Sequence, residues 1–123
     1  MADDLFPIVS TVDLDASLRF YRDLLGGTVS YEFPGPDGRI AYAGLDIGRS
    51  HIGLGHDPGA AARAGSVDLW VYVDDCDATV ERLRAAGVPV LEEPLDQPWG
   101  ERVALVEDPN GIRVRVGTRA PGV

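Results

Sequence analysis

The sequence predicts an α+β fold made of two tandem βαβββ modules. The first observation is an internal repeat, because the run DLDASL at 13–18 resembles DCDATV at 75–80, an offset of 62 residues in a chain of 123. The second is an apolar stripe of helical spacing in each half, and the third is a strand-like run before each stripe. Together these features predict one helix and four strands in each half.

One amphipathic helix is expected in each half, over about 14–25 and 76–86. Apolar residues recur at the spacing of one helix face at Leu14, Leu18, Tyr21 and Leu25, and again at Cys76, Val80 and Leu83. Asp13 and Asp75 stand where an N-cap belongs, and glycines follow both segments as they follow helix C-termini. The repeat therefore includes the signals that start and stop each helix.

Strands surround each helix in the same order. The expected strands are 6–12, 28–33, 39–46 and 50–56 in the first module, and 67–73, 88–92, 101–107 and 112–118 in the second. In 67–73, apolar residues alternate with Asp68, Trp70 and Tyr72, so this strand has two distinct faces. We expect a single domain over 1–123, with module 1 at about 5–56, a link at about 57–66 and module 2 at about 67–119. Because one half alone has too little core, the two modules are expected to curl their sheets around a shared concave space.

Composition excludes several classes of protein. The net charge is −9, all basic residues are Arg, and no basic cluster is present, which argues against binding to nucleic acid. One Cys and two His exclude an internal disulfide and the usual structural zinc modules. No apolar run is long enough for a membrane span, and the N-terminus is acidic where a signal peptide is basic. A soluble protein of the cytoplasm is expected.

Tandem βαβββ units in a chain of this length resemble the vicinal oxygen chelate superfamily, which contains glyoxalase I, extradiol dioxygenases, and the fosfomycin and bleomycin resistance proteins. The run 13–21 followed by 24–26 looks like the usual first helix of that superfamily, and 108–111 (DPNG) looks like its C-terminal turn. The run 97–101 (QPWGE) and the pair Trp70 and Tyr72 are most similar to the bleomycin resistance branch. The resemblance implies a fold of two half-open curled sheets of the glyoxalase/bleomycin resistance type.

Enzymes of this superfamily bind a divalent metal through His and Glu on four strands. The resemblance places those ligand positions at Phe6, Gly53, Asp68 and Arg115. Phe and Gly offer no side-chain donor and Arg is a fixed cation, so only Asp68 could ligate, and no metal or other cofactor is expected. His51 and His56 are five residues apart and fall on opposite faces of a strand. Each is interpreted as a surface or turn histidine, or as a hydrogen-bonding group of the cleft.

The cleft implied by the resemblance would be aromatic, apolar and lightly charged. If Asp68 faces it, the two-residue period of a strand predicts the other residues of the inner faces, and a loop adds one Trp. The ligand-binding candidates are Phe6, Ile8, Ser10, Asp68, Trp70, Tyr72, Trp99, Arg113 and Arg115. Large flat side chains of this kind suit a bulky and partly planar ligand. The alternatives are that Trp70 and Tyr72 pack in a core, and that Trp99 is a packing plug or a dimer contact.

Several charged and polar residues have two interpretations. Asp68 and Arg115 can form an ion pair that replaces the metal, or the arginines can bind an anionic group of a ligand. The acidic balance of the chain can attract a cationic ligand or serve solubility. Cys76 is expected to pack in the core, although a helix N-terminus can activate a thiol. Glu92 and Glu93, like Asp74 and Asp75, are expected to be solvated loop or cap charges.

The leading functional prediction is a homodimer that binds and sequesters a bulky aromatic small molecule, such as an antibiotic or natural product, without catalysis. The resemblance implies the dimer and the mass-action mechanism by which a bound drug is kept from its target. The first alternative is a metal-dependent enzyme of the glyoxalase or dioxygenase type. The second is a metal-free enzyme that uses Asp68 or a His as base. The third is a structural or regulatory domain without a ligand.

Overall fold

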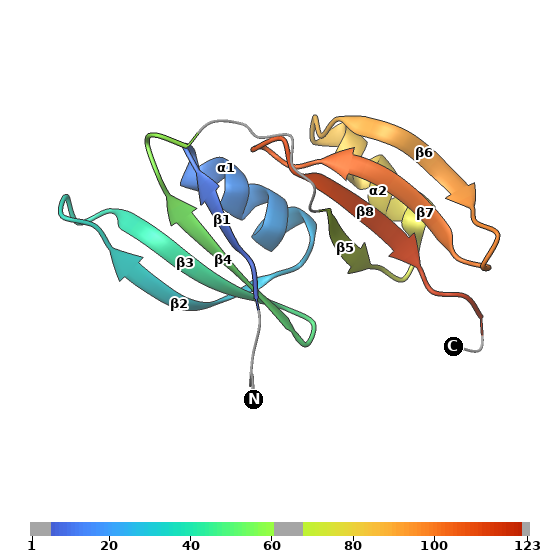
Figure 1. Cartoon of the computed structure of the whole chain (residues 1–123), viewed down its shortest axis with the longest axis horizontal. Coiled ribbons are helices and arrows are strands. Elements are labelled where there is room, and N and C mark those ends of the chain that lie inside the picture. Colours follow the sequence, from blue (N-terminus) through green and yellow to red (C-terminus); the bar gives the residue numbers. More distant parts are fainter. Residues whose placement is uncertain (1–5, 61–67, 122–123) are drawn as a thin grey trace. The chain divides into compact units, whose positions relative to one another are not determined.

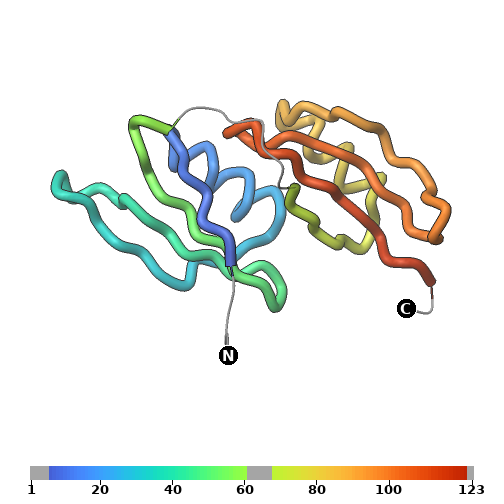
Figure 2. Tube along the Cα trace, viewed as in Figure 1, coloured from blue at the N-terminus to red at the C-terminus, as the bar shows by residue number. Residues whose placement is uncertain are grey.

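A computed structural model describes residues 6–60 and 68–121, which form two compact units, one within 1–61 and one within 62–123. The first unit contains β1 (Ile8–Thr11), α1 (Leu14–Leu18), a π-helical segment η1 (Arg19–Leu24), β2 (Thr28–Pro34), β3 (Ile40–Ile47) and β4 (Ser50–His56). The second contains β5 (Leu69–Tyr72), α2 (Cys76–Ala85), β6 (Val90–Asp96), β7 (Arg102–Glu107) and β8 (Arg113–Thr118). The tube in Figure 2 follows this strand–helix–three-strand path twice along the chain.

Each unit is one mixed four-stranded sheet with its helix packed on one face (Figure 1). The strand orders are β1-β4-β3-β2 and β5-β8-β7-β6. The first strand of each order pairs in parallel with its neighbour, and the other pairings are antiparallel. The predicted α+β class with two tandem βαβββ modules is therefore confirmed.

The internal repeat extends to the pairing of the strands. Ile8 lies opposite Gly53 in the first unit, and Trp70 lies opposite Arg115 in the second. Both members of the second pair stand 62 residues after those of the first, the same offset that relates the N-caps. A position on the first sheet can thus be compared directly with its counterpart on the second.

The helix starts follow the predicted caps. The Asp13 carboxylate accepts a hydrogen bond from the backbone N–H of Ala16 at 3.0 Å, and Asp75 accepts one from Ala78 at 3.1 Å. These bonds satisfy N–H groups that the first turn of a helix leaves without a partner. In the first unit the predicted helix 14–25 begins as α1 and continues as η1, whereas α2 is regular over ten residues.

The core of each unit lies between its helix and the facing side of its sheet. In the first unit the largest fully buried side chains are Phe20, Tyr21, Leu45 and Leu54, and in the second they are Val80, Leu83, Val106, Val114 and Val116. Along β1, Val9 and Thr11 are buried in this layer, whereas Ile8 and Ser10 on the opposite face are exposed. Among the described residues of each unit, no helix covers the second face of its sheet, which is called the open face below.

One strand is longer than the sequence pattern predicts. The pattern ends the strand at residue 92, but β6 continues to Asp96. β6 is the outer strand next to β7, and its pairing shifts register between Glu92 and Leu95, so that Pro94 lies at an irregularity. A proline without an N–H is tolerated at such a place on an outer strand. Glu92 and Glu93 therefore belong to a strand and not to a loop or cap, although both are exposed to solvent as expected.

Two of the predicted boundaries cannot be followed in full. Residue 67 of the expected strand 67–73 and residues 61–66 of the expected link lie outside the described residues. At the start of that link, the Asp57 carboxylate accepts a hydrogen bond from the Gly59 N–H at 3.0 Å and forms a turn. In the described ranges, none of the helices has the length and apolar character needed to cross a membrane.

Candidate functional site

Trp70 and Tyr72 of β5 project from the open face of the second sheet, as the two-residue period of a strand requires. Their side chains are 43% and 39% exposed, and their ring centroids are 5.9 Å apart. The indole of Trp70 lies against Gly117 of β8, where a Cβ would come within 3.2 Å of the ring nitrogen. In the second unit these rings form a surface, and the alternative that they pack in a core is wrong.

A carboxylate and two guanidinium groups lie beside these rings. The Asp68 carboxylate is 3.4 Å from Nη2 of Arg115 and 3.8 Å from Nε of Arg113. The ion pair that the sequence suggests between Asp68 and Arg115 is therefore present. All three side chains retain about a third or more of their exposure, so water screens the pair.

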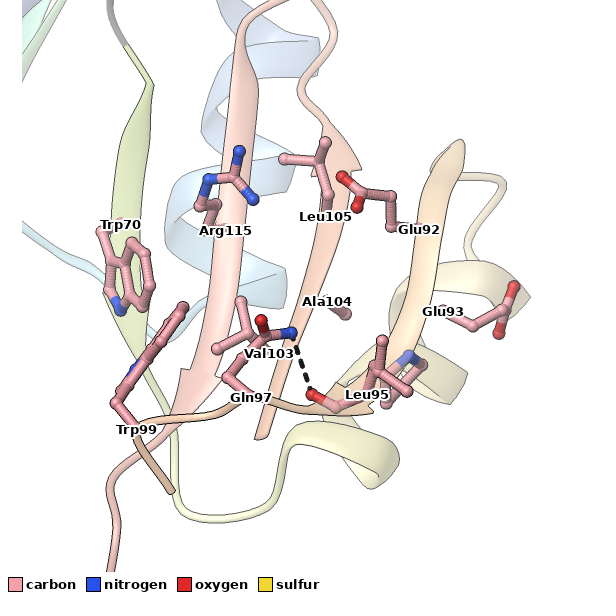
Figure 3. Close-up of a pocket in the computed structure, with 11 residues that line it drawn as sticks. Trp70, Glu92, Glu93, Leu95, Gln97, Trp99, Val103, Ala104, Leu105 and Arg115 are labelled. Carbon is pink, nitrogen blue, oxygen red and sulfur yellow. Dashed lines mark hydrogen bonds between the residues drawn. The ribbon is translucent and has the colours of Figure 1, made fainter. Parts of the chain in front are cut away.

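The open face of the second sheet carries a pocket of about 550 Å³ (Figure 3). Its lining comes from β5, β6, β7, β8 and the turn between β6 and β7: Trp70, Glu92, Glu93, Pro94, Leu95, Gln97, Trp99, Val103, Ala104, Leu105 and Arg115. Figure 3 shows Trp70 and Trp99 on the β5 side of this pocket and Leu95 on the β6 side. Trp99 is 59% exposed, so its indole forms a wall and not a buried plug.

The pocket contains three of the predicted site residues, namely Trp70, Trp99 and Arg115. Asp68, Tyr72 and Arg113 come from the same sheet or its edge and lie outside the lining. Phe6, Ile8 and Ser10 belong to the first unit, where Ile8 and Ser10 project from the open face of β1.

Sequence reasoning missed the β6 and β7 side of the pocket. Val103 and Leu105 of β7 are buried although they lie on the open face. Their partners on β8 are Gly117 and Arg115, respectively. A signal for this was available, because the run VALV at 103–106 is apolar at every position and a strand of that kind is covered on both faces. Leu95 and Gln97 were missed because the pattern ends β6 before them.

The turn after β6 holds Trp99 beside β5. Two backbone hydrogen bonds close it, from Gln97 N–H to the Glu101 carbonyl at 2.8 Å and from Gly100 N–H to the Gln97 carbonyl at 2.9 Å. The indole N–H of Trp99 donates to the Glu101 carboxylate at 2.8 Å. Hydrogen bonding to the same carboxylate raises the pKa of the Tyr72 hydroxyl, and burial adds to this shift.

The open face of the first sheet has a different character. Phe6 meets the His51 imidazole edge-to-face at 4.8 Å, and Nδ1 of His51 is 2.9 Å from the Asp46 carboxylate. The Tyr42 ring lies over Gly53, where any Cβ would collide with the phenol. His51 is thus a hydrogen-bonded residue of this face, and His56 is exposed at the end of β4. The further exposed aromatics Tyr31 and Phe33 on β2 were not foreseen.

The residues at the four positions that the resemblance assigns to metal ligands do not have the donors that a divalent metal needs. Phe6 has no donor, the ring of Tyr42 covers Gly53, and Arg115 brings a positive charge next to Asp68. Within residues 6–60 and 68–121, no three His, Cys, Asp or Glu side chains gather as a metal site requires.

Cys76 is a packing residue. Its side chain is fully buried at the start of α2, and its thiol donates a hydrogen bond to the Val116 carbonyl at 3.3 Å. Burial raises the pKa of this thiol, which disfavours the nucleophilic thiolate.

The chain belongs to the glyoxalase/bleomycin resistance protein/dioxygenase superfamily, whose family model matches residues 7–116. It is 30% identical to a probable lactoylglutathione lyase of Synechocystis sp. over 91% of this chain and 92% of that protein. It is 33% identical to a lactoylglutathione lyase of Haemophilus influenzae over 83% and 82% of the two chains. The structure of a bleomycin resistance determinant encoded on the transposon Tn5 is similar with a TM-score of 0.70, 21% identity, and coverage of 96% and 98%. The last likeness is one of fold alone.

Proposed function

We propose that the protein binds a bulky aromatic small molecule, such as an antibiotic or natural product, and sequesters it without changing it chemically. The observation that carries this proposal is the pocket of about 550 Å³ with Trp70 and Trp99 at one side. Pockets that take drug-sized ligands in proteins are about 300–1,000 Å³ in volume. A bound drug would be kept from its target by mass action, as in a drug-binding resistance protein.

The indoles of Trp70 and Trp99 are expected to supply most of the affinity for an aromatic ligand. About half of each side chain is in contact with water in this chain, which is costly for a large apolar ring. A planar ligand placed against them would remove that surface from water, and it would order few rotatable bonds because a Trp side chain has only two. Val103 and Leu105 give the pocket an apolar floor.

The polar lining favours a ligand that also carries a hydrogen-bond donor or a positive charge. Glu93 is paired with Arg84, and Arg115 is paired with Asp68. The Glu92 carboxylate has no hydrogen bond or ion pair in the described part of the chain. Its free carboxylate leaves the lining with one uncompensated negative charge, and the net charge of −9 acts in the same direction over longer distances.

A second candidate function is metal-dependent catalysis, favoured by the names of the two lyases to which the chain is similar. The residues at the four ligand positions argue against it, since only Asp68 offers a donor. Metal analysis of protein purified without chelator separates the two functions: about one equivalent of a divalent metal per subunit would support the enzyme. A metal-free enzyme with Asp68 or His51 as base would convert a bound ligand, whereas a binder would return it intact.

We further propose that the protein acts as a homodimer in the cytoplasm. The resemblance to the superfamily supports the dimer, as do the exposed aromatic side chains on the open face of the first sheet. Sedimentation equilibrium would give twice the chain mass of 13.1 kDa if this is right, and the single chain mass at all concentrations if it is wrong.

Fluorescence titration tests the binding function directly. We expect the emission of the two Trp residues to be quenched by at least one planar aromatic compound in a panel containing proflavine, an anthracycline, a quinoline and bleomycin. Trp70→Ala should weaken that binding by at least about tenfold, because a central aromatic anchor is lost. Glu81→Ala, on the exposed side of α2, is the control and should leave the affinity unchanged. Absence of binding by every compound would refute the proposal.

A further inference from the structure

One carboxylate lies where the Trp99 turn meets the edge strand β5. Glu101 is half-buried at the end of this turn, and its Oε1 accepts the indole N–H of Trp99 at 2.8 Å. Figure 3 shows the indoles of Trp99 and Trp70 on the same side of the pocket, the side next to β5. In the described part of the chain, Glu101 is the one hydrogen-bond partner of this indole.

The backbone of the turn does not by itself determine where the indole points. The two hydrogen bonds between Gln97, Gly100 and Glu101 close the turn, and Gly100 adopts a φ of +99° that favours glycine. Trp99 nevertheless remains more than half exposed, so few packing contacts restrict its two side-chain torsions. An indole with so few neighbours needs a specific bond to hold one orientation.

The same carboxylate faces the second aromatic residue of β5. Interaction with the Glu101 carboxylate raises the pKa of the Tyr72 hydroxyl above the ordinary value for tyrosine. The guanidinium of Arg119 stacks on the ring of Tyr72, with its Cζ 3.9 Å from the ring centroid. Tyr72 in turn lies 5.9 Å from Trp70, centroid to centroid. Glu101 therefore connects the turn to the aromatic pair on the strand.

We propose that Glu101 is the positioning residue of the pocket, which holds the Trp99 indole in the lining on the β5 side so that this side of the pocket is formed before a ligand arrives. This inference rests on the proposed binding function. A wall that is already ordered loses less conformational entropy on binding, so the carboxylate increases affinity without touching the ligand. The substitution of Glu101 should then weaken binding of aromatic compounds of many shapes by a similar factor.

The first test needs no ligand. The two indole N–H signals of the protein can be recorded by NMR and assigned with Trp70→Phe. In Glu101→Ala the Trp99 signal should move toward the position of a solvated indole, and acrylamide should quench Trp99 at least about twice as strongly in the Trp70→Phe background. Glu101→Gln keeps an oxygen that can accept the bond and should recover most of the wild-type behaviour. Glu81→Ala, on the exposed side of α2, is the matched control and should change neither signal.

A second signature comes from Tyr72. Loss of the carboxylate should lower the pKa of its hydroxyl toward the ordinary value, because the hydrogen bond to Glu101 is the main cause of the rise. This can be followed by the absorbance of tyrosinate with Tyr72→Phe as the reference. An unmoved pKa would show that Glu101 does not face Tyr72 in solution, which would contradict the connection between the turn and the strand.

The last test uses proflavine as the probe. Glu101→Ala should weaken its binding by about three- to tenfold and Glu101→Gln by less than about twofold, with circular dichroism showing that both variants are folded. An unchanged Trp99 signal in Glu101→Ala, or a loosened Trp99 with unchanged proflavine affinity, would overturn the inference. If wild-type protein binds no compound of the panel, the proposed function fails, and the NMR and quenching results alone decide whether Glu101 orients Trp99.

Discussion

The two units of this chain share one construction and differ on their open faces. In both, an Asp caps the helix, and the first strand pairs with the last strand in the same register. On the helix side the paired residues are alike, with Val9 opposite Leu54 in the first unit and Val71 opposite Val116 in the second. On the open face the paired residues differ between the units. Ile8 of the first unit corresponds to Trp70 of the second, and Gly53 corresponds to Arg115.

This difference separates residues that serve the fold from residues that serve a ligand. Positions against the helix are constrained by close packing and keep their apolar character in both copies. Positions on the open face have no such partner within their unit and are free to diverge. The first unit combines aromatic rings with glycines there, whereas the second carries charges and the pocket. We therefore expect substitutions of the two classes to affect different properties.

The largest expected effects are in the shared cores. Leu45→Ala in the first unit and Leu83→Ala in the second each remove a fully buried side chain, which costs about 2–5 kcal/mol of unfolding free energy. Urea denaturation followed by circular dichroism measures both. Ile8→Ala, at a residue that is 59% exposed, is the control and should change stability by less than about 0.5 kcal/mol. A cost for Ile8→Ala comparable to that of the core variants would show that the open face is also part of a packed core.

A smaller effect is expected at the glycine that corresponds to Arg115. In Gly53→Ala the new methyl group meets the Tyr42 ring, which must swing away at a cost of about 1 kcal/mol. Tyr42→Ala removes the obstacle, so the cost of Gly53→Ala should largely disappear in the double variant. A double-mutant cycle in urea measures this coupling. Additive costs would mean that Tyr42 does not cover Gly53 in solution.

The smallest effect on stability is expected at the ion pair. Arg115→Ala breaks a partly exposed pair with Asp68, and such pairs contribute about 0–1 kcal/mol. The loss should shrink further in 0.5 M salt, because exposed charges are screened. If Arg115 instead orients the ligand, binding of the panel compound will weaken while stability stays the same. A cost well above 1 kcal/mol would identify the pair as a structural link between β5 and β8.

Much of the second sheet's open face could be predicted because strand periodicity is local. Alternation along 67–73 was sufficient to place Trp70 and Tyr72 on one face, and the repeat was sufficient to align β5 with β1. The β6 side of the pocket was not predictable in the same way, because Pro94 interrupts the pattern while an irregular outer strand accommodates it. The run 97–101 contains Glu101, but nothing in it indicates that this carboxylate also reaches Tyr72, which lies on another strand.

By itself, the sequence determined the fold class, the two helices with their Asp caps, and the family to which the chain belongs. The fold class and the helix starts depend on periodicity and on capping, which involve residues that are close together in the sequence. Only the tertiary structure decided that Trp70, Trp99 and Arg115 line one pocket and that one carboxylate meets both Trp99 and Tyr72. Those arrangements depend on strand order and register, which bring together residues that are distant along the chain.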